Sequence, residues 1–115
     1  MAVEDFPFHH PITKLVIDTS ATDTELVAAA GANKIIRVVF VTFIVAGAVT
    51  VTFQSHTTTN ITGSMQLPAN DGIALGYCPY GYFETVANEK LNLELSSGVS
   101  CDGFLGYQVI DTGIV

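Results

Sequence analysis

A run of apolar residues over 33–55, mostly β-branched or aromatic, constrains the fold of this chain more than any other segment. Val, Ile, Phe and Thr fill the run, and these side chains fit the pleated, half-buried surface of a β-sheet. The run predicts a β-hairpin, with a long strand from Ile35 to Val45, a tight connection at Ala46-Gly47-Ala48 and a return strand from Val49 to Ser55. Apolar and polar residues alternate in the return strand, so we expect one of its faces to be buried and the other to be wet.

The long strand does not alternate, because both of its faces are apolar. One face carries Ile35, Val39, Val41, Phe43 and Val45, and the opposite face carries Ile36, Val38, Phe40 and Ile44. A small two-layer domain buries only one face of each sheet in its own core, so the second face needs another cover. We expect this cover to be the N-terminal segment of the chain or a neighbouring subunit.

The N-terminal segment is predicted to be an extended arm over residues 1–13, ahead of a single domain over residues 14–115. It contains two prolines, two phenylalanines and the pair His9-His10, with no usable period. Phe6 and Phe8 are suited to docking on a neighbouring subunit or on the second face of the long strand. The candidate interface residues are therefore Phe6, Phe8, His9, His10, Ile36, Val38, Phe40 and Ile44.

The composition also favours an assembly. The 115 residues are 49% hydrophobic and only 13% charged, with a mean hydropathy of +0.45. A chain this short has a high surface-to-volume ratio and cannot hide so much apolar material inside itself. Large exposed apolar patches on stable proteins usually mark interfaces. We therefore predict an oligomer, and the alternative is a monomer coated with uncharged Thr and Ser.

The charge distribution argues against nucleic acid and membrane partners. The net charge is -7, and the only cationic residues besides histidine are Lys14, Lys34, Arg37 and Lys90. Phosphate binding needs clustered Lys and Arg. The segment 35–53 has the length of a membrane helix, but Arg37, Gly47 and its β-branched residues favour the hairpin. The N-terminus lacks the basic start and apolar core of a signal peptide, so we expect synthesis in a cytoplasm.

Shorter segments of the same kind flank the central run. Strands are predicted at Lys14–Ser20, Ile61–Leu67, Ile73–Cys78, Phe83–Val86, Leu91–Leu95 and Ser100–Asp111, with a short strand or helical turn at Glu25–Ala30. Asn92 and Glu94 are expected on the wet face of their strand. About eight strands at regular spacing, without a convincing helix, predict an all-β antiparallel sandwich that is jelly-roll-like. A simpler Greek-key sandwich or barrel is the alternative.

No set of residues in the sequence predicts catalysis, a metal site or a cofactor. The HExxH and paired CxxC patterns of zinc sites and the GxSxG elbow of hydrolases are absent. Glu84, Glu89 and Glu94 are spaced by five and are expected to form a wet hairpin edge rather than a carboxylate pair. Cys78 and Cys101 are expected to be buried free thiols, because a disulfide is unexpected in a cytoplasm.

An aromatic cluster around Cys78 is the most distinctive local composition. It consists of Tyr77, Tyr80, Tyr82 and Phe83. Aromatic loops at the end of a sandwich bind carbohydrate or a protein partner, since each ring buries a large area at little entropic cost. Such rings equally well close the bottom of a core, and both interpretations remain open.

The order of segments from Asp18 to Ile110 resembles that of small all-β virion proteins of tailed bacteriophages. The segments are TELVAAAGANKIIRVVFVTF, AGAVTVTFQS, GYFETVANEKLNLELSS and GFLGYQVID. By size the chain is most similar to capsid decoration (cement) proteins. This resemblance implies a β-sandwich or jelly roll that oligomerises, as a homotrimer or homodimer, on the outside of a phage head. It implies the major capsid protein as partner, the virion surface as location and no active site.

Two other functions are hypotheses from different classes. A receptor- or glycan-binding domain of a phage tail fibre or spike would use the aromatic cluster as its binding surface. A small hydrolase would need a specific carboxylate or Ser/His pair, and the sequence singles out none.

Overall fold

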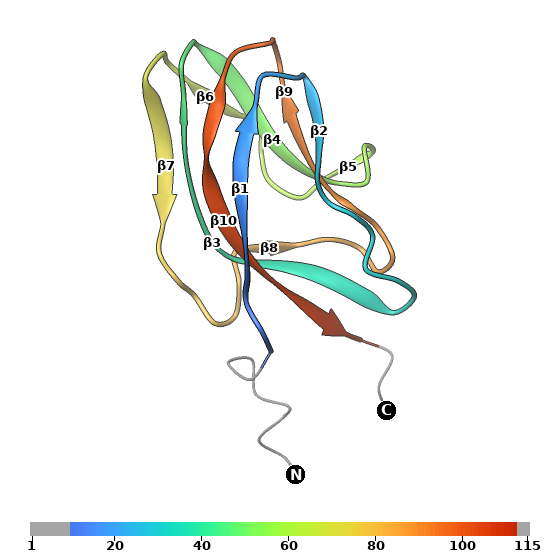
Figure 1. Ribbon diagram of the computed structural model, residues 1–115. Helices are drawn as coiled ribbons and strands as arrows, with labels where there is room; N and C mark the ends of the chain where they lie inside the picture. The colour runs from blue at the N-terminus through green and yellow to red at the C-terminus, as the bar shows by residue number, and fades with distance from the viewer. Residues whose placement is uncertain (1–9, 113–115) are drawn as a thin grey trace.

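The computed structural model describes residues 10–112, which fold into two packed antiparallel sheets of five strands each (Figure 1). Sheet A contains, in spatial order, β1 (Thr13–Thr19), β10 (Cys101–Asp111), β3 (Lys34–Val45) and β7 (Asp71–Leu75), with β8 (Phe83–Glu84) also paired to β3. Sheet B contains β2 (Asp23–Val27), β9 (Leu91–Leu95), β4 (Val49–Ser55) and β5 (Thr59–Asn60), with β6 (Met65–Leu67) also paired to β4. The described residues contain no helix, and the prediction of an all-β sandwich is confirmed.

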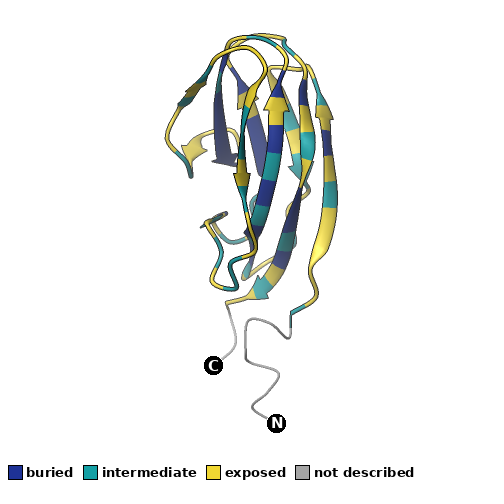
Figure 2. Ribbon diagram, turned by 90° about the vertical axis from the view of Figure 1, so that its left-hand side faces the viewer, coloured by how far each residue is buried: buried dark blue, intermediate teal, exposed yellow. Residues whose placement is uncertain are grey.

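The core lies between the two sheets and is built from the alternating inner residues of their central strands. Phe43 of β3 and Phe53 of β4 meet across it edge to face, with ring centroids 6.0 Å apart. Leu93 of β9 and Leu105 of β10 are fully buried beside them. Figure 2 shows strands banded with buried and exposed residues, as expected when one face of each strand packs on the opposite sheet.

The predicted hairpin of the central run is wrong, because its two arms belong to different sheets. β3 pairs with β10, β7 and β8 in sheet A, while β4 pairs with β9, β5 and β6 in sheet B. The connection Ala46-Gly47-Ala48 crosses from one sheet to the other, and the Ala46 amide donates to the Ser100 carbonyl at 2.9 Å. A hairpin and a crossing between sheets bury the same alternating residues, so the hydrophobic pattern alone does not separate them.

A bulge in β3 explains in part why both of its faces read as apolar. Tyr107 of β10 pairs with Val38 and its neighbour Gly106 pairs with Phe40, so Val39 is an extra residue without a register partner. An extra residue moves every later side chain to the other face. Before the bulge Ile36 and Val38 face the core, and after it the core residues of β3 are Val41, Phe43 and Val45.

Candidate functional site: the outer face of sheet A

The strand register of sheet A places three rows of side chains on the surface that points away from the core. We call this surface the outer face of sheet A. Directly opposed residues of antiparallel strands share a face of the sheet. The first row is Lys14, Gly106 and Phe40; the second is Val16, Phe104, Thr42 and Ala74; the third is Asp18, Asp102, Ile44 and Gly72.

Apolar side chains lie in all three rows of this face, and three of them are open to solvent. Val16 is 68% exposed, Ile44 is 58% exposed and Phe104 is 38% exposed. The rings of Phe40 and Phe104 contact each other edge to face, with centroids 6.0 Å apart. The three rows across four strands span roughly 400 Å², an area that also contains Lys14, Asp18 and Asp102.

Opposite charges lie in the first and the third row of the face. At one end the Lys14 ammonium group lies 5.1 Å from the centre of the Phe104 ring. At the other end Asp18 and Asp102 oppose each other on β1 and β10. A hydrogen bond with Asp18, followed by loss of hydration and by the negative charge of Asp18, raises the pKa of Asp102 above its ordinary value. The face is therefore positive at one end and negative at the other.

The structure divides the predicted interface residues into three groups. Phe40 and Ile44 lie on the outer face of sheet A, as the pattern indicated. Ile36 and Val38 are 0% exposed and lie in the core of the same chain, because the bulge turns them inward. The prediction that these two residues form an interface is therefore wrong. The remaining ones belong to the predicted arm. Phe6, Phe8 and His9 lie outside the described residues, and the His10 carbonyl accepts a hydrogen bond from the Gln108 side chain at 2.9 Å.

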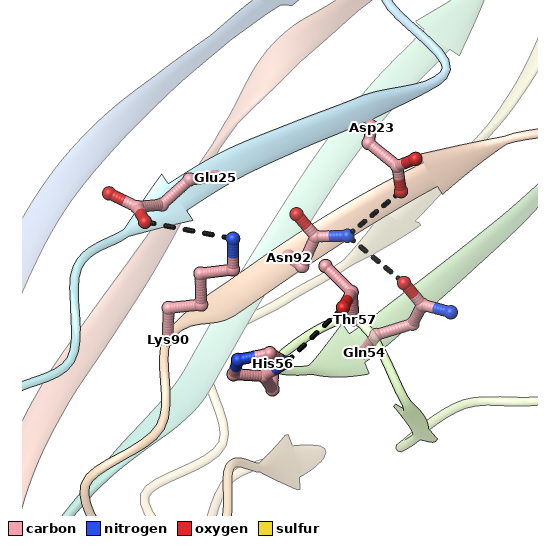
Figure 3. Close-up of polar contacts among 7 residues, drawn as sticks. All are labelled: Asp23, Glu25, Gln54, His56, Thr57, Lys90 and Asn92. Atoms are coloured by element: carbon pink, nitrogen blue, oxygen red, sulfur yellow. Dashed lines mark hydrogen bonds and ion pairs between the residues drawn. The ribbon is translucent and has the colours of Figure 1, made fainter.

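The outer face of sheet B is built differently, from polar side chains that bond to one another (Figure 3). Asn92 is 1% exposed. Its side-chain amide group donates to the Asp23 carboxylate at 3.3 Å and to the side-chain carbonyl oxygen of Gln54 at 3.0 Å. The Gln54 amide group in turn donates to Asn60 at 3.0 Å. Glu25 and Lys90 form an ion pair at 3.9 Å along the edge. We call this series of hydrogen-bonded side chains the polar ladder; it runs through Asp23, Asn92, Gln54 and Asn60.

The aromatic cluster separates into an exposed part and a packed part. Tyr77 and Tyr80 are 50% and 76% exposed, whereas Phe83 packs on Phe53 with ring centroids 4.9 Å apart. The Tyr82 hydroxyl donates to the Gly76 carbonyl at 2.6 Å. Tyr82 and Phe83 also line an apolar cavity of about 230 Å³ between the sheets, with walls from β3, β4, β6 and β7. Phe83 therefore contributes to the core, and binding of a partner by the exposed tyrosines stays a prediction.

The acidic residues that the sequence offered for catalysis are dispersed. Glu84 pairs with Arg37 at 3.1 Å, Glu89 accepts a hydrogen bond from Ser55 at 2.5 Å, and Glu94 is exposed on β9. Within residues 10–112, no three His, Cys, Asp or Glu side chains lie close enough together to hold a metal ion.

Both cysteines are free thiols. Cys101 is fully buried, and Cys78 is only half-buried. Burial, followed by the charge of Asp102, raises the pKa of Cys101 to about 11, so this thiol stays protonated at neutral pH.

In the part of the chain that the structure describes, no helix is long and apolar enough to span a membrane. Comparisons of the chain with protein-family models, with curated proteins and with solved structures found no match.

Proposed function

We propose that this protein is a non-enzymatic structural subunit of a virion that associates with copies of itself and binds the outside of a phage capsid. The observation that carries the proposal is the outer face of sheet A. Val16, Ile44 and Phe104 leave an apolar surface open to water there, although the same domain buries a core of its own between the sheets. Burial of such a surface against another chain contributes about 25 cal/mol for each Å² removed from water.

The strand order supports the assignment to a jelly-roll virion protein. The pairing is nested: β1 pairs with β10, β2 with β9, β3 with β7, and β4 with β5 and β6. Rolling up one long antiparallel ribbon produces this order, and jelly rolls built in this way are common among capsid proteins. The segment order from Asp18 to Ile110, which resembles that of small all-β virion proteins of tailed bacteriophages, points in the same direction.

A modest interface is sufficient for this role. The flat area of roughly 400 Å² lies below the roughly 800 Å² per partner of a typical stable complex, so we expect weak and concentration-dependent self-association. On a capsid many copies sit side by side at high effective concentration, and repeated weak contacts then give firm attachment.

Sedimentation velocity over a wide concentration range tests the self-association. We expect the mass to rise with concentration from that of the 12.2 kDa chain to that of an oligomer. Val16→Asp inserts a charge into the middle of the outer face and is expected to keep the chain monomeric. Val86→Asp is the matched control, because it makes the same change at another valine that is 51% exposed and lies off this face. A wild-type chain that stays monomeric at every concentration contradicts self-association through this face.

Immunogold labelling of phage virions purified from cells that produce the protein tests its location. Gold particles over the heads support the capsid assignment. Label on the tails favours the alternative function, and virions without label contradict both.

The alternative function is a receptor- or glycan-binding domain of a tail fibre or spike. The exposed rings of Tyr77 and Tyr80 favour it, together with the apolar cavity beside Tyr82. Under this alternative, Tyr80→Ala and Tyr82→Ala abolish binding to host cells or to a glycan array while the fold survives. Under the structural proposal, neither substitution changes attachment to the capsid.

A further inference from the structure

The outer face of sheet A is complementary to itself when one copy is turned end over end. From this we propose that two chains pack outer face to outer face about a two-fold axis that runs across the strands. Lys14 of each chain then lies opposite Asp18 and Asp102 of the other. This arrangement rests on the self-association proposed above and specifies its partner and orientation.

The register of the sheet leads to this geometry. A two-fold axis along the middle row, through Val16, Phe104 and Thr42, keeps each strand over its own copy but reverses its direction. The first row of one chain then faces the third row of the other. On β1 this brings Lys14 opposite Asp18, and on β3 it brings Phe40 opposite Ile44. Phe104 meets its own copy near the axis.

The charges select this orientation over the other two-fold arrangement. With an axis parallel to the strands, each row faces its own copy with the strand order reversed, so Lys14 of each chain lies at the same end of the interface as Lys14 of the other. The Asp18 and Asp102 side chains of both chains then gather at the opposite end. Like charges gathered at one end destabilise an interface. Lys14 is the one cationic residue in the three rows, and each chain already carries a net charge of -7. Only the reversed orientation brings opposite charges together.

The shape of the outer face of sheet A also fits the reversed orientation. The Phe40 ring lies over Gly106, where a Cβ atom in place of the glycine hydrogen would fall 2.1 Å from a ring carbon. Gly106 therefore leaves room for the ring to lie flat on the sheet beside the second row. In the reversed arrangement Phe40 faces the 58% exposed side chain of Ile44 from the partner chain, so on β3 an apolar group covers an apolar group on both sides of the axis.

A charge-swap cycle tests the orientation, with sedimentation equilibrium as the measurement. Lys14→Glu and Asp18→Lys are each expected to raise the dimer dissociation constant roughly tenfold, because each change sets like charges face to face twice in the symmetric dimer. The double variant is expected to bind at least roughly threefold more tightly than either single variant. Residues four apart on one strand are roughly 13 Å apart, so this recovery arises between chains.

Lys34→Glu is the matched control, since it makes the same charge change outside the three rows. It is expected to keep the wild-type dissociation constant within about twofold, as surface charges beyond the Debye length are largely screened. A melting curve for each variant verifies that the chain is folded.

The outcomes separate the two proposals. A wild-type chain that stays monomeric overturns self-association and with it this arrangement. A wild-type dimer whose affinity does not respond to Lys14→Glu overturns only the reversed orientation, and so does a double variant that is no tighter than the single variants.

Discussion

The outer faces of the two sheets differ in how their side chains are shielded from solvent. Each sheet buries one face in the shared core and turns the other outward. On sheet B the outward side chains of the polar ladder bond to one another and shield themselves, so that Asn92 is 1% exposed and Gln54 is 5% exposed. On sheet A the outward side chains of Val16 and Ile44 have no such cover and remain 68% and 58% exposed.

This difference indicates which face has partners for its side chains within one chain and which face is available to bind a second chain. Polar groups on sheet B already have partners, and binding another protein there would mean breaking hydrogen bonds that are worth about 1 kcal/mol each. Apolar atoms on sheet A face only water, and their burial is favourable. Substitutions on sheet B should therefore change the stability of the fold, whereas substitutions on sheet A should change association.

The largest effect is expected from Asn92→Leu in the polar ladder. Leucine has nearly the same size, but it removes the two hydrogen bonds that the Asn92 amide group donates and leaves the nearly buried Gln54 carbonyl oxygen without this donor. An unsatisfied buried acceptor destabilises a fold by about 1–3 kcal/mol, so the free energy of unfolding should fall by about 2 kcal/mol. Urea denaturation at a concentration where the chain is monomeric measures this change.

Glu94→Gln is the control for Asn92→Leu, because Glu94 lies on the same strand but is exposed. Its unfolding free energy should stay within about 0.5 kcal/mol of wild type. If Asn92→Leu were as stable as wild type, the polar ladder would not be what stabilises sheet B, and the contrast between the faces would lose its energetic basis.

The next effect is expected from Ile44→Ser on sheet A, and it should appear in association. The substitution removes an exposed apolar group from each side of a symmetric contact, so the dissociation constant should rise about tenfold, which corresponds to about 1.4 kcal/mol. The unfolding free energy of the monomer should change by less than about 0.5 kcal/mol, because the side chain is 58% exposed. Sedimentation velocity gives the first quantity and urea denaturation the second.

Val86→Ser is the control for Ile44→Ser, since Val86 is 51% exposed and lies in the loop after β8. It should leave the dissociation constant unchanged. Equal weakening by both substitutions would mean that general surface hydrophobicity, and not the outer face of sheet A, drives association.

The fold class could be predicted from the sequence, but the way the strands are joined could not. Alternation in Val49–Ser55 reports that one face is buried and contains no information on which strands lie beside it. The extra residue Val39 also helps to make β3 look apolar on both faces. At this bulge the residues that face the core change from even-numbered to odd-numbered positions. Bulges depend on the pairing of two strands, here of β3 with β10, which is distant in the sequence.

The site could be predicted only in part, for the same reason. Phe40 and Ile44 follow from the apolar excess of β3, and Val16 could have been added because Leu15 and Ile17 on either side of it point inward. The opposition of Asp18 and Asp102 needs the register of β1 on β10, which joins the two ends of the domain. Likewise the alternation of β9 places Asn92 on the wet face, and only the neighbouring strands show that side chains of the ladder cover it.

The smallest effect concerns pH, and its sign should differ between folding and association. The pKa of Asp102 is raised in the single chain by its hydrogen bond with Asp18, so the folded chain binds this proton more tightly than the unfolded chain. Protonation of Asp102 therefore stabilises the monomer, and its unfolding free energy should increase slightly as the pH falls through the raised pKa. Asp18 is the charged group that faces Asp102 from β1, whereas Ile44, which faces it from β3, carries no charge.

Association should respond to the same proton in the opposite direction. In the reversed dimer Lys14 of the partner favours ionised Asp102, so association should tighten by a few-fold as the pH rises through the raised pKa. Sedimentation and urea denaturation across acidic pH measure the two trends, and Asp102→Asn should weaken both. Trends of the same sign would mean that Lys14 of the partner does not lie at the acidic end of the face.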